Sequence, residues 1–531
     1  MERTATRFAR RAIAALAFCV ALAAALALGS CAPAGSSGPG GGAARSTGVT
    51  LKVVAGSEVK DMQPIIEDFQ KETGIAVSFT YIGTLDGTEE VMNGSGDAAS
   101  FDATWFPSNA YMSLFDAKSQ KVAQETSIMR TPVVLGVKKD AYASLGLSPS
   151  STWQDIVNLA KDGKLRFGMS SPVSSNSGFS TIVELSTALS GTGSAITPDD
   201  VERVKGQMSD FAKGQTMTSG SSGWLMDEYG NREGDVDAVF NYESLILQHD
   251  DLVEVAPQDG VVTADYPLTL LSGRSDEAND AYAKLVDYLK RDDVQKRIAD
   301  ETHRRTDASS AADSIQAFEV PFPNKIDTVH ALLDAWVSEV RKPANMVFQI
   351  DTSGSMFGQG IEDLKTSLDS LVTDQSGGTT GSLLIFQPRE QVRFIEFGTG
   401  VKSVKDVTMG DAASTADLQS YISHLSPSGG TAMYSTLEQS LTYASQTKSD
   451  GNVTSVVLFT DGVDNGSVSL SGFESWYRAH PEVQGVPVYC ILFGEADARQ
   501  MQQVADLTGG KVFDSSDGGL QSAFKEIRGY L

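Results

Sequence analysis

The stretch MVFQIDTSGSM, residues 346–356, decides the fold of the C-terminal part of the chain. It begins with MVFQI, a short and mostly apolar run typical of a buried strand. It ends with Asp351, Ser353 and Ser355, which place one carboxylate and two hydroxyls at alternate positions. Two interpretations are open for such a stretch. It can be a strand-to-helix turn in which Asp351 caps backbone amides, or it can be one part of a metal site.

The residues that follow repeat this pattern of short apolar runs and amphipathic segments. Runs of this length that alternate with amphipathic helices indicate a mostly parallel sheet covered by helices on both faces. The chain from residue 344 is therefore expected to be a doubly wound α/β domain. The expected strands are 346–350, 381–387, 391–398, 454–460 and 486–493, and the expected helices are 360–372, 431–445 and 523–531.

Polar side chains follow three of these segments. Thr431 comes after the loop SPSGG and opens a helix, and Asp461 comes directly after the strand TSVVLFT. In parallel sheets, ligand sites form at the carboxyl ends of strands, where the loops converge. Two carboxylates and three hydroxyls are hard oxygen ligands that suit Mg²⁺, Mn²⁺ or Ca²⁺, whereas zinc favours sulfur and imidazole. The candidate metal residues are Asp351, Ser353, Ser355, Thr431 and Asp461.

This combination resembles the von Willebrand factor A domain with its metal-ion-dependent adhesion site. The family pattern is Asp-x-Ser-x-Ser, a distant Thr, and an Asp in a Thr-Asp-Gly turn, and residues 344–531 fill every position. The resemblance implies that Ser353 and Ser355 bind the ion directly and that Thr431 binds directly or through water. It also implies that an acidic side chain of a partner protein completes the metal shell. Asp464 and Asn465 lie nearby and are interpreted as a solvated polar turn.

The N-terminus predicts export. Four arginines precede an apolar run at residues 12–28, which is typical of a secretory signal peptide over residues 1–30. A transmembrane helix is disfavoured, because the run is barely long enough to span and is broken at Gly29. Leu-Gly-Ser-Cys at 28–31 resembles the lipobox of bacterial lipoproteins. That implies lipidation of Cys31, attachment to the membrane through the lipid only, and a location on the outer face of the cytoplasmic membrane. Residues 31–48 read as a flexible Gly/Ser/Pro tether.

Residues 49–323 repeat a strand–helix–strand order that indicates parallel βαβ units. The arrangement resembles the type 2 periplasmic-binding-protein fold of extracellular solute-binding proteins. It rests on the strand, Gly-Ser-Glu and helix at 53–69, and on RTPVVLGVKK followed by a Thr-Trp-Gln-Asp helix start at Thr152. That fold has two α/β lobes joined by crossover strands, here expected at RTPVVLGV and DYPLTLLSG. Residues 324–343 carry an apolar stripe with Trp336 and are expected to be a docked connecting helix.

Loops after the predicted strands supply candidate residues for a solute cleft. Their hydroxyl and amide groups favour an oxyanion or another small polar solute, although Glu58 argues against an anion. The alternative is that loops are ordinarily rich in such residues. His303, Arg304 and Arg305 are interpreted as a surface cationic cluster. The candidate ligand residues are Ser57, Glu58, Thr84, Ser108, Asn109, Ser175, Asn176, Ser177 and Tyr242.

The composition and the absence of catalytic sequence motifs narrow the classes of function that the sequence supports. The 531 residues carry a net charge of −26, which argues against nucleic acid as a partner. No P-loop, HExxH or dinucleotide fingerprint is present, and Ser57-x-x-Lys60 lacks its companion motifs. The sequence therefore predicts a non-enzymatic cell-surface lipoprotein that binds another protein through a metal-bridged acidic residue. An alternative is the substrate-binding receptor of an ABC-type transporter with an accessory A domain. A metal-dependent hydrolase is a third hypothesis.

Overall fold

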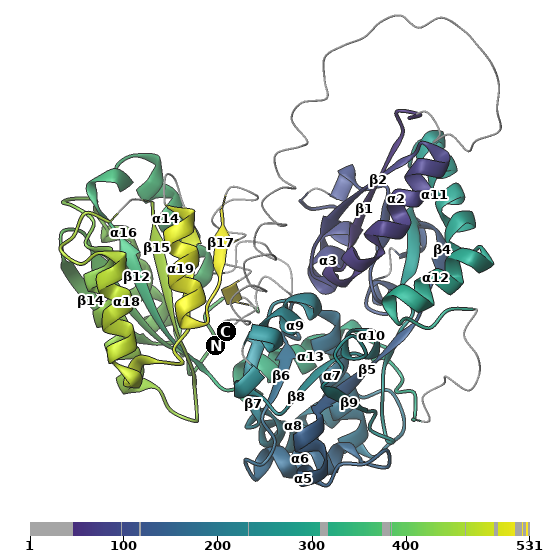
Figure 1. The fold of residues 1–531 in the computed structure, drawn as a ribbon, viewed down its shortest axis with the longest axis horizontal. Helices are drawn as coiled ribbons and strands as arrows, with labels where there is room; N and C mark the ends of the chain where they lie inside the picture. Colours follow the sequence, from purple (N-terminus) through teal and green to yellow (C-terminus); the bar gives the residue numbers. More distant parts are fainter. Residues whose placement is uncertain are drawn as a thin grey trace, which may run out of the picture. The chain divides into compact units, whose positions relative to one another are not determined.

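The computed structural model describes most of the chain from residue 46 onward (Figure 1). The described residues are 46–96, 98–115, 118–231, 233–307, 317–373, 383, 385–461, 464–492, 497–515, 523 and 527–528. The predicted signal segment, Cys31 and nearly all of the tether lie outside them, as does most of the expected helix at 523–531. No helix within the described ranges is long and apolar enough to cross a membrane.

The first lobe is built on a five-stranded sheet in the order β2-β1-β3-β11-β4. β1 and β2 are parallel and flank α2, which confirms the expected βαβ unit (Figure 1). α2 buries Ile65, Ile66 and Phe69 and ends at Gly74, whose left-handed backbone caps the helix. The strands are β1 Thr50–Ala55, β2 Ala76–Tyr81, β3 Ala103–Trp105, β4 Val122–Ser127 and β11 Pro267–Leu271, and the main helices are α2 Gln63–Thr73, α3 Thr84–Asn93, α11 Asp276–Leu289 and α12 Asp292–Thr302.

The second lobe holds a six-stranded sheet in the order β10-β5-β8-β6-β7, with β9 also paired to β5. The chain leaves the first sheet after β4, enters the second at β5, and returns from β10 to β11. These are the two crossovers expected from the sequence. Its strands are β5 Thr131–Lys138, β6 Phe167–Ser170, β7 Gln215–Ser219, β8 Ala238–Tyr242, β9 Leu252–Val255 and β10 Thr263–Ala264, and its helices are α5 Lys139–Leu145, α6 Trp153–Lys161, α7 Asn176–Ser190, α8 Pro198–Ala212, α9 Ser222–Asn231 and α10 Glu243–Ile246.

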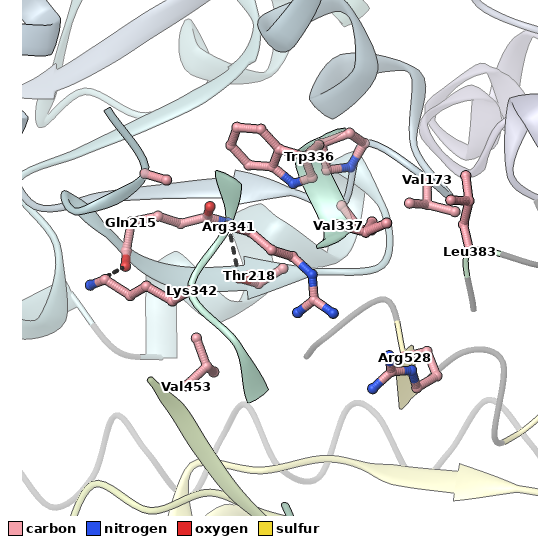
Figure 2. A pocket seen from close by; sticks show the side chains of 13 residues that line it. Val173, Gln215, Thr218, Trp336, Val337, Arg341, Lys342, Leu383, Val453 and Arg528 are labelled. Atoms are coloured by element: carbon pink, nitrogen blue, oxygen red, sulfur yellow. Dashed lines mark hydrogen bonds between the residues drawn. The ribbon is translucent and has the colours of Figure 1, made fainter. Parts of the chain in front are cut away.

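The connecting helix is docked, as expected. α13 (Ile326–Ala335) continues as one π-helical turn, η6 (Trp336–Val340). Its apolar stripe belongs to the hydrophobic core of the second lobe, where the Trp336 ring centroid lies 6.5 Å from that of Phe211. Lys342 then donates a hydrogen bond to the Gln215 carbonyl at 3.2 Å. Figure 2 shows Gln215, Trp336, Arg341 and Lys342, which line part of a small cavity of about 40 Å³.

The C-terminal domain has a six-stranded sheet in the order β14-β13-β12-β15-β16-β17, parallel except at β13–β14. Val347 and Phe348 of β12 point into separate cores on opposite faces of the sheet, because successive side chains alternate. Both faces are therefore covered, as predicted (Figure 1). The strands are β12 Ala344–Asp351, β13 Gln391–Phe397, β14 Val401–Thr408, β15 Val453–Thr460, β16 Val488–Leu492 and β17 Val512–Asp514, and the helices are α14 Gln359–Val372, α16 Ala412–His424, α17 Met433–Thr447, α18 Leu470–Ala479 and α19 Ala498–Thr508.

One expected strand is wrong. Of residues 381–387, Leu383 is helical, and Ile385, Phe386 and Gln387 lie in no strand. β13 occupies the position beside β12, from Asn345↔Gln391 to Asp351↔Phe397, so Phe386 of this run packs on the face of the sheet instead. There the ring of Phe386 meets Phe348 edge-on, with centroids 5.6 Å apart.

Candidate functional site

Four of the five predicted metal residues form one hydrogen-bonded network at the carboxyl ends of β12 and β15. These strands are parallel neighbours with Ile350 opposite Phe459, so Asp351 and Asp461 emerge at the same edge of the sheet. The Ser353 amide donates to Asp351 Oδ1 at 2.8 Å, and the Ser355 hydroxyl donates to Asp461 Oδ1 at 2.8 Å. The hydroxyls of Ser353 and Ser355 lie 2.9 Å apart.

Asp351 is fixed from its other side by a residue that the sequence analysis missed. The Thr460 hydroxyl donates to Asp351 Oδ2 at 2.7 Å. Both carboxylate oxygens of Asp351 are therefore committed to protein donors, one on each side. This geometry suits a residue that orients the serine loop and accepts hydrogen bonds, and it leaves the hydroxyls to face an ion.

Thr431 is buried and lies two residues before α17. Its amide donates to the side-chain oxygen of Asn465 at 2.8 Å, and its hydroxyl makes no hydrogen bond among the residues that the structure describes. The preceding loop reaches the serine loop, because the Gly354 amide donates to the Gly429 carbonyl at 2.9 Å. The structure therefore brings the Thr431 loop against the serine loop, and the Thr431 hydroxyl has no hydrogen-bond partner within the described ranges.

Asp464 and Asn465 form a polar turn in which Asn465 is exposed, as interpreted, but the turn also makes contacts that the sequence did not indicate. Asp464 accepts hydrogen bonds from the amides of Met433 at 2.8 Å and Tyr434 at 3.4 Å, at the N-terminus of α17. Together with the Asn465 contact to Thr431, these bonds tie the β15 loop to the Thr431 loop. The helix dipole favours a carboxylate at a helix N-terminus, which explains why Asp464 caps α17.

Burial disfavours the ionised form of the two candidate carboxylates, Asp351 and Asp461. Burial raises the pKa of Asp351 and of Asp461, and the nearby Asp351 charge raises the pKa of Asp461 further. Lys402 opposes this only in part, because its ammonium donates to the Thr352 carbonyl at 2.5 Å and not to either carboxylate. A bound cation would offset the repulsion between the Asp351 and Asp461 carboxylates and lower the pKa of both.

The donor set fits a hard divalent ion held mainly by hydroxyls. Within the described part of the chain, no cluster of three or more His, Cys, Asp or Glu side chains could hold a metal. The oxygens that meet here come instead from the carboxylates of Asp351 and Asp461 and the hydroxyls of Ser353 and Ser355, and the Thr431 hydroxyl belongs to the adjoining loop. Oxygen ligands of low total charge suit Mg²⁺, Mn²⁺ or Ca²⁺ and would leave the ion with residual positive charge.

Part of the predicted solute set gathers at the start of α7 in the second lobe. The Ser177 hydroxyl lies 2.8 Å from that of Ser222 and 2.7 Å from that of Ser170. Ser175 lies 3.2 Å from Ser222, which makes one buried serine cluster. The Asn176 amide donates to the Tyr242 hydroxyl at 3.0 Å, so these two candidates also meet.

Glu58 joins a buried charged cluster that the sequence analysis did not foresee. Arg304 is 1% exposed and donates to the Glu58 carbonyl at 3.1 Å and to Asp61 at 2.5 Å. Arg305 pairs with Glu243, so the prediction of a surface cationic cluster at 303–305 is wrong for both arginines. Burial raises the pKa of Glu58 to about 7, and the Arg304 charge reduces that rise. Tyr242 lies beside this cluster, because its ring centroid is 6.1 Å from that of Tyr266. Burial raises the pKa of Tyr242, and the Glu58 charge raises it further.

Of the remaining solute candidates, Ser57 and Thr84 lie close to the serine cluster, since a Cβ built on Gly83 would stand 2.2 Å from the Ser174 carbonyl oxygen, whereas Ser108 and Asn109 do not. Asn109 donates to Glu125 at 3.0 Å and to Thr269 at 2.8 Å, within the first lobe. The Ser108 hydroxyl accepts from the Ala110 amide at 3.1 Å, and Thr84 is buried as the first residue of α3. Ser57 lies near α9, since a Cβ built on Gly223 would stand 4.0 Å from its hydroxyl.

Comparison with known proteins supports the two-domain description. The family "Bacterial extracellular solute-binding protein" matches residues 51–301, and the von Willebrand factor type A domain matches residues 345–526. Inter-alpha-trypsin inhibitor heavy chain H2 is 29% identical in Mus musculus and 27% in Sus scrofa over 130 residues, which are 23% of this chain. The chain spans only 12% of the length of these curated relatives.

Two solved structures are similar to the N-terminal part. The periplasmic binding protein P5PA is 13% identical, with 55% of this chain and 100% of that chain covered and a TM-score of 0.44. A periplasmic thiamin binding protein is 14% identical, with 54% and 93% covered and a TM-score of 0.41. The family matches agree with the two lobes, each built on one sheet, and with the mostly parallel C-terminal sheet. The chain therefore joins an extracellular solute-binding-like domain to a von Willebrand factor type A domain.

Proposed function

We propose that this chain is a non-enzymatic surface lipoprotein whose A domain binds a partner protein through a divalent metal ion. Mg²⁺ is the ion of choice, with Mn²⁺ or Ca²⁺ as alternatives, and an acidic side chain of the partner completes its coordination. The carrying observation is the network that joins Ser353 and Ser355 to Asp351 and Asp461 at one sheet edge. On this proposal the N-terminal domain holds a small polar solute, and lipidated Cys31 anchors the protein.

The chain's own residues divide the work at this site. The hydroxyls of Ser353, Ser355 and Thr431 would hold the ion, which supplies a positive charge with an open coordination position when bound. Asp351 holds the serine loop in place, because one of its oxygens accepts from the Ser353 amide and the other from the Thr460 hydroxyl. Asp461 accepts from the Ser355 hydroxyl and aims it.

The excess of hydroxyls over carboxylates supports binding of an acidic group. Asp351 and Asp461 together supply at most two negative charges to a divalent ion. Burial raises the pKa of both carboxyl groups, which disfavours two negative charges here when the ion is absent. A partner carboxylate therefore gains a strong electrostatic contact with the ion. Metal dependence of partner binding follows directly.

Metal binding is tested by calorimetric titration of the full chain with MgCl₂, MnCl₂ and CaCl₂. Ser353→Ala removes one hydroxyl ligand and is expected to abolish saturable binding, and Asp351→Asn is expected to weaken it strongly. Ser475→Ala at an exposed position of α18 and Asp363→Asn at a half-buried position of α14 are matched controls in the same domain and should bind as the native chain does. Unchanged binding by Ser353→Ala would refute the site assignment.

Partner binding and anchoring need their own measurements. Proteins captured from a cell-envelope extract with Mg²⁺ should be released by EDTA and should not be captured by Ser353→Ala. Capture that is unchanged by EDTA and by Ser353→Ala would contradict metal-bridged binding.

Cys31→Ser should move the protein from the membrane fraction to the soluble fraction, and continued membrane association would contradict the lipid anchor.

A second candidate function is the substrate-binding receptor of an ABC-type transporter with an accessory A domain. The match of residues 51–301 to extracellular solute-binding proteins favours it, and the polar groups around Ser177 and Tyr242 offer hydrogen bonds to a small solute. A panel of sugars, amino acids and oxyanions should then raise the melting temperature of the native chain. A Tyr242→Phe variant should lose that response, and a panel without any responding solute would count against transport.

A further inference from the structure

Phe357 is the most exposed large hydrophobic side chain in the described part of the protein, with 82% of its surface accessible. The other exposed large apolar residues there are at most 49% accessible. Single exposed hydrophobic residues are ordinary, so exposure alone says little. The position of Phe357 is what matters, because it follows Ser355 by only two residues.

The backbone holds Phe357 outward. Met356, its neighbour, is fully buried in the core beneath the sheet edge. The turn Gly354–Met356 is closed by a hydrogen bond from the Phe357 amide to the Gly354 carbonyl at 3.3 Å. On the other side, Gly358 has φ 95° and ψ −127°, a conformation that side chains other than glycine strongly disfavour. The ring is thus presented to solvent by a constrained turn between a buried anchor and a glycine.

The surroundings of Phe357 on this loop are polar or small. Ser355, Gln359, Gly429 and Asn465 are all exposed, and none of them offers a large apolar surface. Two residues separate Phe357 from Ser355 by at most about 7 Å of chain. An aromatic ring therefore stands close to the proposed metal contact, and the exposed residues named here, among those the structure describes, are polar or small.

We propose that Phe357 determines which acidic residue the metal site accepts. The inference rests on the proposed function and deepens it. The partner presents an Asp or Glu carboxylate flanked by aliphatic or aromatic side chains, so that the metal takes the carboxylate while the flanking groups cover the Phe357 ring. Aromatic anchors at the centre of an interface commonly carry a large share of the binding energy, and a constrained anchor loses little entropy on binding.

A displayed peptide library with an invariant central Asp and randomised flanks tests this with the full native chain in MgCl₂. The selected peptides should be enriched in Leu, Ile, Val, Phe or Tyr within two positions of the Asp. Phe357→Ser should bind a selected peptide about tenfold more weakly and should select peptides without that flank preference. Val404→Ser is the matched control, since Val404 is exposed on β14 of the same domain, and it should behave as the native chain.

The outcomes separate the two proposals. Mg²⁺-dependent selection of Asp peptides without apolar flanks, or equal affinity of native chain and Phe357→Ser, overturns the role of Phe357 and leaves the metal-bridged function standing. A library with central Asn that is selected as well as the Asp library overturns both. Because Phe357 is exposed, Phe357→Ser is expected to keep the native melting temperature, so loss of affinity reports on binding and not on folding.

Discussion

Replacing Glu58 by Gln is expected to remove a pH-dependent loss of stability. The pKa of Glu58 lies near 7 in the folded chain because burial raises it from its ordinary 4.5. The folded state therefore keeps the proton at pH values where the unfolded state releases it. Stability from this group is complete below about pH 4.5 and falls as the pH rises toward 7. The shift corresponds to about 3 kcal/mol of unfolding free energy that the native chain loses above pH 7.

The buried neighbours of Glu58 explain both the sign and the size. Asp61 raises the pKa of Glu58 further, whereas the Arg304 guanidinium and the neighbouring Tyr266 lower it. Glu58 Oε1 has no hydrogen-bond partner among the described residues, so ionisation leaves a poorly solvated charge. Glutamine keeps the size of the side chain and cannot ionise.

The assay is urea unfolding followed by tryptophan fluorescence from pH 4.5 to pH 8, with Glu67→Gln on the exposed face of α2 as the matched control. The stability of Glu58→Gln relative to the native chain should rise by about 3 kcal/mol across this range, because the native chain alone pays the ionisation cost. The Glu67→Gln control should show no such trend. A difference between Glu58→Gln and the native chain that stays constant with pH would refute the reasoning.

Three further substitutions test the fold. Thr152→Ala removes a capping box in which the Asp155 amide donates to the Thr152 hydroxyl, and should lower stability by about 1 kcal/mol in urea unfolding. Trp336→Ala leaves a cavity in the second lobe, should cost about 3–5 kcal/mol, and should speed proteolysis of the connecting helix. Glu390→Gln strips the buried partner from Arg341 and Arg528 and should cost about 3–5 kcal/mol by thermal unfolding. Full stability in any of these variants would contradict the contact it removes.

The placement of Asp351 and Asp461 at one edge of the sheet could be predicted because this geometry follows from strand order. Asp351 and Asp461 come directly after apolar strands, and parallel strands bring such ends to one edge of a sheet. Thr460 was missed because it is the last residue of its own strand, and only the register with β12 aims its hydroxyl at Asp351. The hydrogen bonds of Asp464 and Asn465 were not predicted because their partners lie more than 30 residues away in sequence.

Arg304 shows why the cleft could not be predicted from local patterns. An arginine flanked by polar residues is ordinarily exposed. Its burial depends on Asp61, 243 residues earlier, and on the ring of Tyr266, whose centroid lies 4.9 Å from the guanidinium. Nothing near residue 304 in the sequence signals either contact.

The strand β14 was missed for a different reason. Its residues VKSVKDVT alternate charged and small side chains, and only Val407 is buried. The strand pairs with β13 and ends the described strand order of that sheet, where charged side chains protect an exposed edge from pairing with other chains. A pattern selected against aggregation does not carry the apolar signal by which strands are recognised.

The docking of α13 and η6 changes where the N-terminal domain ends. The family match stops at residue 301, yet Val329, Leu332 and Trp336 fill the core of the second lobe. A polypeptide cut at residue 323 would leave that core open on one side, whereas one cut at residue 343 would carry its own cover. The connecting segment is thus a structural part of the first domain, and the chain that joins this domain to the A domain shortens to residues 341–343.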